Sequence, residues 1–77
     1  MDPQQPVLVI AGNYRQALDW ARWRNIPRPR VRYIHDSQGL RGLAPGTVIY
    51  AVGEQTRAAG ELRDEAMAQG FDVREDL

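Results

Sequence analysis

The fold of this chain follows from one stretch, VLVIAGNYRQALDWARWRNIPRPRVRYIH, residues 7–35. It opens with VLVIA, Val7–Ala11, an apolar run without alternation, which is typical of a strand covered on both faces. Gly12 and Asn13 break the run, and Asn13 has the side chain of a good helix N-cap. We therefore expect a buried strand that leads at once into a helix.

Residues 14–24 have the spacing of a helix. Four of their side chains fall on one stripe of a helical wheel, about 100° wide: Tyr14, Ala17, Leu18 and Ala21. Pro27 and Pro29 prevent the helix from continuing, because proline lacks a backbone donor and restricts the residue before it. We expect the first helix to end near Asn25, with its stripe packed on a sheet.

The segment VRYIH, Val31–His35, alternates and is rich in strand formers, which predicts a second strand. The Asp36–Ser37 pair can cap a short turn of helix after it, in which Leu40 and Leu43 are expected to point inward. The residues APG at 44–46 predict a turn, which leads the chain back toward the sheet.

The run TVIYAV at 47–52 predicts another strand buried on both faces, which Gly53 ends. Residues 54–69 then predict a second long helix. Its expected inner stripe consists mostly of alanine, which permits a close approach to the sheet: Ala58, Ala59, Leu62 and Ala66. Gly60 weakens this helix by about 1 kcal/mol relative to alanine.

Gly70 supplies a C-terminal stop for that helix, and FDVRE at 71–75 predicts a short fourth strand. Apolar strands that alternate with helices favour a parallel sheet with right-handed crossovers. We therefore predict an α/β fold, a minimal Rossmann-like β-α-β-β-α-β domain over residues 1–77. Its four-stranded parallel sheet has the order 2-1-3-4, because strands one and three are the most apolar, and the two helices cover opposite faces.

Length and composition restrict the class of protein. The chain has 77 residues, enough for one domain, and no cysteine, so it has neither a disulfide framework nor a thiolate metal site. Its first residues, MDPQQPVLVIAG, carry an acidic residue where a signal peptide carries positive charge, and no segment reaches the ~20 apolar residues of a membrane span. We expect a cytoplasmic protein, in the host cytoplasm if the chain comes from a phage.

The charge is zero in sum but uneven along the chain. Residues 1–41 carry seven arginines and three acidic residues, a net charge of +4, and residues 42–77 carry three arginines and seven acidic residues, a net charge of −4. Lysine is absent. A preference for arginine favours bidentate and stacked contacts, and it is equally the mark of a GC-rich genome.

The outer face of the first helix is the first candidate site. Trp20 and Trp23 lie about 120° and about 180° from the centre of the inner stripe, on the side that faces water. Exposed apolar clusters mark interfaces, and tryptophan and arginine are enriched in binding hot spots. The predicted partner-binding residues are Trp20, Trp23, Arg15, Arg24, Arg28 and Arg30. The alternative is that IPRPR folds back so that a proline covers an indole and arginines stack on it.

The carboxyl ends of the central strands are the second candidate site, because ligands bind there in doubly wound sheets. Gly12, Asn13, Gly53 and Glu54 are the residues that we expect to hold a small anion or a nucleotide there. The alternative is that the glycines only serve the tight turns. The chain has neither a dinucleotide fingerprint nor the lysine of a phosphate loop.

Catalytic arrangements find little support. His35 and Ser37 have no evident third member, and the acidic pairs at 64–65 and 75–76 are typical of solvated surface. A transition-metal site requires at least one more nitrogen or sulfur ligand. We therefore expect no catalytic residue, no metal and no cofactor.

Two stretches resemble a known family. VLVIAGNYRQALDWAR resembles the strand and helix just downstream of the phosphate loop in helicase and phage-terminase ATPases, and LRGLAPGTVIYAVGE resembles the stretch that carries their Walker B acid. The resemblance implies the fold and not the activity. The phosphate loop is missing, and the corresponding strand ends in Ala51, Val52 and Gly53 with Glu54 one position late. In its arginine-rich, lysine-free character the chain is also similar to short accessory proteins of actinobacterial phages.

These features favour a non-enzymatic protein-interaction module, a small phage or bacterial accessory protein that binds a protein partner or itself. In a homo-oligomer, the basic half of one subunit would face the acidic half of another. The first alternative is nucleic-acid binding through the arginine and tryptophan patch. The second is anion binding at the strand ends.

Overall fold

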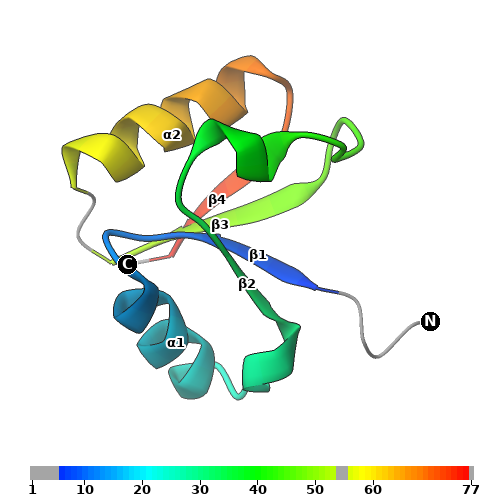
Figure 1. The fold of residues 1–77 in the computed structure, drawn as a ribbon. Coiled ribbons are helices and arrows are strands. Elements are labelled where there is room, and N and C mark those ends of the chain that lie inside the picture. Colours follow the sequence, from blue (N-terminus) through cyan, green and yellow to red (C-terminus); the bar gives the residue numbers. More distant parts are fainter. Residues whose placement is uncertain (1–5, 54–55, 77) are drawn as a thin grey trace.

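The computed structural model describes residues 6–53 and 56–76 of the chain. It has four parallel strands in the order β2-β1-β3-β4 and two helices, which confirms the predicted small α/β domain (Figure 1). The elements are β1 (Val7–Ile10), α1 (Tyr14–Trp23), β2 (Val31–Ile34), β3 (Val48–Val52), α2 (Arg57–Ala68) and β4 (Asp72–Asp76), with 3₁₀ turns at Arg28–Arg30 and Ser37–Leu40.

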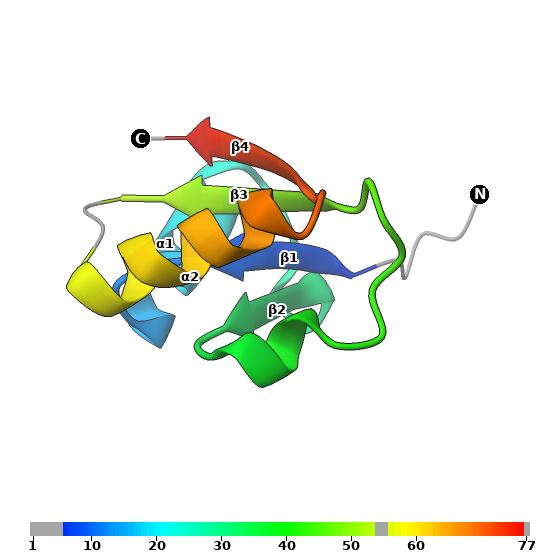
Figure 2. The same ribbon diagram turned by 90° about the horizontal axis from the view of Figure 1, so that it is seen from above.

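The sheet separates the two helices. Seen along the sheet, α1 lies on one face and α2 on the other, and the second view shows β2 and β4 at the two edges (Figures 1 and 2). This is the layered arrangement that alternating strands and helices produce when every crossover is right-handed. The loops after β1 and β3 therefore come together at one end of the sheet, where the chain turns to opposite sides.

Two apolar clusters of unequal size hold the layers together, because successive side chains of a strand point to opposite faces. The cluster under α2 is the larger and consists of Leu8, Ile10, Ile34, Leu40, Ile49, Ala59, Leu62, Ala66 and Phe71. The cluster under α1 has four buried residues: Val9, Ala11, Ala17 and Val52. Partly buried aromatic residues complete it, namely Trp20, Tyr33 and Tyr50.

Helix α1 starts and stops as the sequence predicts. The Asn13 side chain accepts a hydrogen bond from the Gln16 backbone at 2.8 Å, which satisfies one of the free amides of the first turn. The helix ends at Trp23, and Asn25 takes a left-handed backbone with φ +59° before the two prolines. Both expected boundaries are confirmed to within two residues.

One member of the expected inner stripe of α1 is placed differently. Ala17 and Ala21 are buried and Leu18 is half-buried, but Tyr14 is 46% exposed. The Tyr14 ring lies 5.8 Å from the ring of Tyr33. The stripe prediction was wrong for Tyr14 because this first residue of α1 contacts Tyr33 on the edge strand β2, where its ring is not enclosed.

Helix α2 begins at Arg57, and the Thr56 hydroxyl caps it by accepting from the Ala59 amide at 3.2 Å. The helix was expected from residue 54, and residues 54–55 lie outside the described part of the chain. The inner face consists of Ala59, Leu62 and Ala66, whereas Ala58 is exposed, contrary to the prediction. Ala58 precedes Leu62 by four residues and so lies beside the packed row, but it stands in the first turn of α2 and borders an open hollow with Ser37 and Glu61.

The connection between β2 and β3 follows the sequence closely. Asp36 caps the 3₁₀ turn by accepting from the amides of Gln38 and Gly39, and Leu40 is 2% exposed. Leu43 packs against the larger cluster as a partly buried side chain. Within the described residues, no helix is long and apolar enough to cross a membrane.

Candidate interaction surface on helix α1

Trp20 lies over the sheet and not in the solvent. Its indole is half-buried against the smaller cluster, with the ring centroid 5.1 Å from that of Tyr50. The indole N–H donates to the Asp76 carboxylate at 2.9 Å, which joins α1 to the end of β4. The helical wheel predicted that Trp20 faces water. That prediction was wrong, because the indole packs on Tyr50 of β3 and reaches Asp76 of β4, beside the alanines of the inner stripe.

Arg24 completes this contact. Its guanidinium pairs with the same Asp76 oxygen at 3.2 Å and lies 5.9 Å from the Trp20 ring centroid. The cation–π contact of the alternative explanation is therefore present, and Arg24 makes it. Because the Arg24 side chain is 45% exposed, we expect the ion pair to contribute under about 1 kcal/mol, mainly by fixing the geometry.

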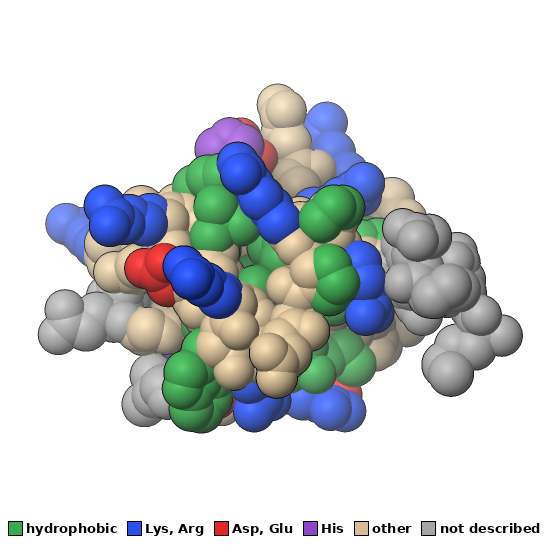
Figure 3. Space-filling model, turned by 90° about the horizontal axis from the view of Figure 1, so that it is seen from below, with side chains coloured by type: hydrophobic (Ala, Val, Ile, Leu, Met, Phe, Trp, Pro, Cys, Tyr) green, Lys and Arg blue, Asp and Glu red, His purple; other side chains and the backbone are tan. Residues whose placement is uncertain are grey.

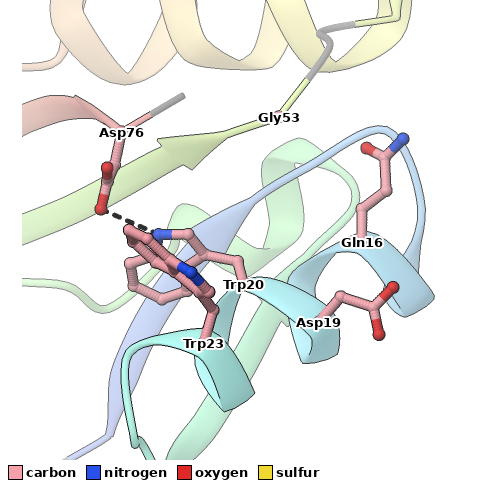
Figure 4. A pocket seen from close by; sticks show the side chains of 6 residues that line it. All are labelled: Gln16, Asp19, Trp20, Trp23, Gly53 and Asp76. Carbon is pink, nitrogen blue, oxygen red and sulfur yellow. Dashed lines mark hydrogen bonds between the residues drawn. The ribbon is translucent and has the colours of Figure 1, made fainter.

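Trp23 is the exposed member of the pair. It is the last residue of α1 and is 75% exposed, one turn beyond the anchored Trp20. The two indoles border an open hollow of about 440 Å³ (Figure 4). The hollow is lined by Gln16, Asp19, Trp20, Trp23, Gly53 and Asp76. An exposed indole at the rim of a hollow is the arrangement of a binding surface.

The hollow lies at the carboxyl end of the sheet. Gln16 stands in the first turn of α1 after β1, and Gly53 directly follows β3, so the lining comes from both loops at the point where the strand order reverses. Figure 4 shows both indoles extending toward Asp76, while Gln16 lies on the side of Gly53. Of the strand-edge candidates among the described residues, Gly53 thus lines the same hollow as Trp20 and Trp23, whereas Gly12 and Asn13 do not.

Three lining residues were missed by the sequence-based reasoning. Gln16 and Asp19 share the helix face of Trp20 and Trp23 at spacings of three and four, a pattern that was available in the sequence. Asp76 is 56 residues from Trp20, and only the tertiary structure brings it there.

The backbone amide of Gly12, one of the four residues expected to bind an anion, already has a hydrogen-bond partner within the chain. The Gly12 amide donates to the Gln16 side-chain oxygen at 3.1 Å, and Gly53 has φ +67°, a backbone that favours glycine. The fourth expected member, Glu54, lies outside the described residues. With the carboxylates of Asp19 and Asp76 in the same hollow, its electrostatics do not favour an anion.

The predicted arginines are dispersed by the fold. Arg28 borders a second hollow of about 350 Å³ beside α1, whose lining includes Leu18, Arg22 and Ile26. Arg30 lies in a third hollow with Val7 and Thr47, at the amino ends of the strands. Arg15 is exposed in the first turn of α1. Of these arginines, Arg24 contacts Trp20, Arg28 borders a separate hollow beside α1, and Arg30 belongs to the opposite end of the sheet.

Ion pairs divide the charged side chains into two groups. On α2 and β4, carboxylates are paired within the chain: Glu61 with Arg57, Asp64 and Glu75 with Arg63, and Asp72 with Arg74. The pKa of Arg74 is raised, mainly by its hydrogen bond to Asp72 and secondly by the negative charge of the Asp72 carboxylate. In the described part of the chain, five exposed arginines have no ion-pair partner: Arg15, Arg22, Arg28, Arg32 and Arg41.

The view onto α1 shows the consequence of this division. Arginine side chains stand at several places over the face, and acidic side chains at few (Figure 3). Among the acidic residues that the structure describes, Asp19 and Glu65 have no ion pair, and Asp36 has only the contact with His35. Within residues 6–53 and 56–76, the charges without an ion pair are therefore mostly positive.

The polar residues considered for catalysis do not form a site. His35 is exposed, and its Nε2 lies 3.7 Å from an Asp36 carboxylate whose other oxygen caps the following turn. Over residues 6–53 and 56–76, no group of three or more histidine, cysteine or acidic residues is arranged to hold a metal ion.

Comparisons of this chain with protein-family models, with curated proteins and with solved structures gave no match. The resemblance to helicase and terminase ATPases therefore remains a prediction. Strand β3, which would carry their Walker B acid, ends in Ala51 and Val52, each 1% exposed.

Proposed function

We propose that this protein is a non-enzymatic interaction module that binds a protein partner through the outer face of α1. The observation that carries the proposal is Trp23, 75% exposed at the rim of an open hollow. Tryptophan is among the residues that contribute most to binding when a partner covers them. We propose the cytoplasm as its compartment, that of the host if the chain comes from a phage.

The surroundings of Trp23 support the proposal. It stands on a regular helix next to Trp20, which Asp76 and Tyr50 hold in place. A rigid surface loses less conformational entropy on binding than a loop does. The bordering hollow offers room for a side chain of the partner, so an indole and a cavity are presented together.

The test is the variant Trp23→Ala with Met67→Ala as its matched control. Both remove a large exposed apolar side chain, and Met67 lies on α2 at 46% exposure, on the other face of the sheet. We expect Trp23→Ala to fold normally and to weaken binding of the native partner about 30-fold, as for a hot-spot residue, with no change for Met67→Ala.

The measurement begins with proteins retained from the native host by immobilised wild-type chain, identified by mass spectrometry. Their affinities for the two variants are then determined by titration. Sedimentation of the chain alone over a concentration series tests self-association in parallel. Partners that bind Trp23→Ala as tightly as wild type would refute the proposal.

Nucleic-acid binding is the second candidate, favoured by the exposed arginines without an ion-pair partner in the described chain. It requires an affinity that falls steeply with salt, because bound arginines release counterions from phosphates. A gel-shift titration with single- and double-stranded oligonucleotides at low salt checks this, and an absence of any shift removes the candidate.

A further inference from the structure

We propose that the partner is an acidic polypeptide segment that inserts an apolar side chain beside Trp23 and sets its carboxylates against the arginines around α1. The inference rests on the proposed function and extends it to the chemistry of the partner. Some charged side chains of the described residues pair with one another, and others have no ion-pair partner.

Five of the six described carboxylates between residues 42 and 76 have an arginine partner. Arg63 alone pairs with two carboxylates, those of Asp64 and Glu75, and Asp76 is held by both Trp20 and Arg24. A carboxylate that already has a cationic partner attracts another cation less strongly. The acidic surface therefore offers little to a basic partner.

The α1 side has the opposite character. Arg15, Arg22 and Arg28 are exposed there, and none makes an ion pair with a residue that the structure describes. Arg22 and Arg28 border the hollow of about 350 Å³, which is also lined by the half-buried Leu18 and Ile26 and, on one side, by Asp19. An apolar lining beside two open guanidiniums fits a segment that carries both carboxylates and apolar side chains.

Arg15 adds an independent indication. It occupies the first turn of α1, which has no acidic residue, so its charge faces the positive end of the helix dipole. The fold gains nothing from a cation at this position. A carboxylate of a partner would satisfy both Arg15 and the helix end.

A second copy of this chain is a poorer occupant. In the described residues it offers Asp19 and Glu65 as carboxylates without an ion pair and Asp36, whose contact is with His35, whereas the others would have to leave an arginine first. The sequence-based idea that a basic half meets an acidic half loses part of its electrostatic support, because most described carboxylates of the acidic half already pair with its own arginines and Asp76 pairs with Arg24.

Nucleic acid fits the surface less well than an acidic polypeptide. Asp19 and Asp76 line the hollow in which a base would stack on Trp23, and a phosphate accompanies every nucleotide. A polypeptide can place its carboxylates on the arginines and an uncharged side chain in the hollow. We therefore infer that the partner is a polypeptide and not a nucleic acid.

The experiment titrates the full chain with a synthetic peptide of glutamate and leucine and reads tryptophan fluorescence. Both tryptophans of the sequence line the hollow, so no other indole contributes to the signal. A matched peptide has glutamine in place of each glutamate, a second has alanine in place of each leucine, and a single-stranded oligonucleotide serves as the nucleic-acid probe. Isothermal titration repeats each measurement, because Trp23→Ala changes the fluorescence itself.

The expected result is binding of the glutamate–leucine peptide and much weaker binding of both matched peptides. Arg15→Gln and Arg22→Gln should each weaken the affinity about twofold to fivefold, as for single surface ion pairs. Trp23→Ala should weaken it about 30-fold. Arg41→Gln is the matched control. It removes an equally exposed, unpaired charge beside the 3₁₀ turn that packs on the α2 side, and should leave the affinity unchanged.

Equal binding of the glutamate and glutamine peptides, no binding of either, or an Arg41→Gln effect as large as that of Arg22→Gln would overturn the proposal. Tighter binding of the oligonucleotide, lost in Arg22→Gln, would assign the surface to nucleic acid instead. A native partner that depends on Trp23 but binds through a neutral or basic segment would overturn this inference and leave the proposed function intact. If native partners are indifferent to Trp23, the proposed function itself falls.

Discussion

Trp20 and Trp23 stand three residues apart on one helix and have different roles. Trp20 meets Tyr50 and Asp76, contacts that lie on strands β3 and β4, and its ring is half-buried. Trp23 follows Trp20 by most of one helical turn, and it is 75% exposed to solvent. A double substitution would therefore confuse a structural effect with a binding effect.

We expect Trp20→Ala to lower the free energy of unfolding by about 2–3 kcal/mol, somewhat less than for a fully buried tryptophan. Trp20→Phe keeps most of the packing but loses the hydrogen bond to a carboxylate, worth about 1 kcal/mol. Trp23→Ala should change stability by less than about 0.5 kcal/mol. Urea unfolding followed by circular dichroism measures all three. Equal stability of Trp20→Ala and Trp23→Ala would show that the contact with Asp76 is unimportant for folding.

Two glycines have opposite effects on helix α2. Gly60 lies inside the helix and lowers its stability, whereas Gly70 follows the helix and allows the chain to leave it. Gly60 lies inside the helix with no heavy atom within 4 Å of the position that a Cβ would take, so a methyl group fits there. Gly70 follows the C-cap residue Gln69 with φ +89°, a left-handed backbone that other residues adopt at a cost. The same substitution should therefore act in opposite directions at the two positions.

We expect Gly60→Ala to raise the free energy of unfolding by about 0.5–1 kcal/mol through helix propensity. Gly70→Ala should lower it by about 1–2 kcal/mol through backbone strain. In a domain of this size each kcal/mol shifts Tm by roughly 4–8 °C, so a thermal scan separates the variants. A decrease of Tm in Gly60→Ala would mean that the close packing of α2 on the sheet excludes the added methyl group.

The two edges of the sheet remain open, and charged side chains occupy them. β4 carries Asp72, Arg74, Glu75 and Asp76 in five residues, and β2 carries the exposed Arg32 between the half-buried Val31 and Tyr33. Charges on an edge strand hinder pairing with another edge. The whole molecule is thus protected from edge-to-edge growth, and β2 depends for this on one arginine.

We expect Arg32→Val to promote aggregation, because it turns β2 into a continuous apolar edge. Arg41→Val is the matched control, since it adds the same side chain outside any strand. Light scattering during incubation at raised protein concentration compares the two variants with wild type. Similar scattering from both variants would attribute the effect to added hydrophobicity and not to the edge.

Local patterns were sufficient for most of the fold. The cap at Asn13 and the stop at Gly70 follow from the chemistry of single residues, and the strand order follows from the apolar runs at 7–11 and 47–52. The errors are predictions of burial that rested on a helical wheel alone, which contains no information about the surface on which the helix packs. Tyr14 lies against the edge strand β2 and stays 46% exposed, and Ala58 is exposed although it precedes the buried Leu62 by four residues.

The sequence by itself determined the order of elements, their parallel pairing and the helix face that carries the candidate site, because periodicity, capping and turn chemistry act over a few residues. The tertiary structure decided which tryptophan is covered and which arginines stay open. Asp76 reaches Trp20 across 56 residues, and it is this carboxylate that binds Arg24 as well. Exposure and charge pairing depend on neighbours that are distant in the chain, so no local pattern contains them.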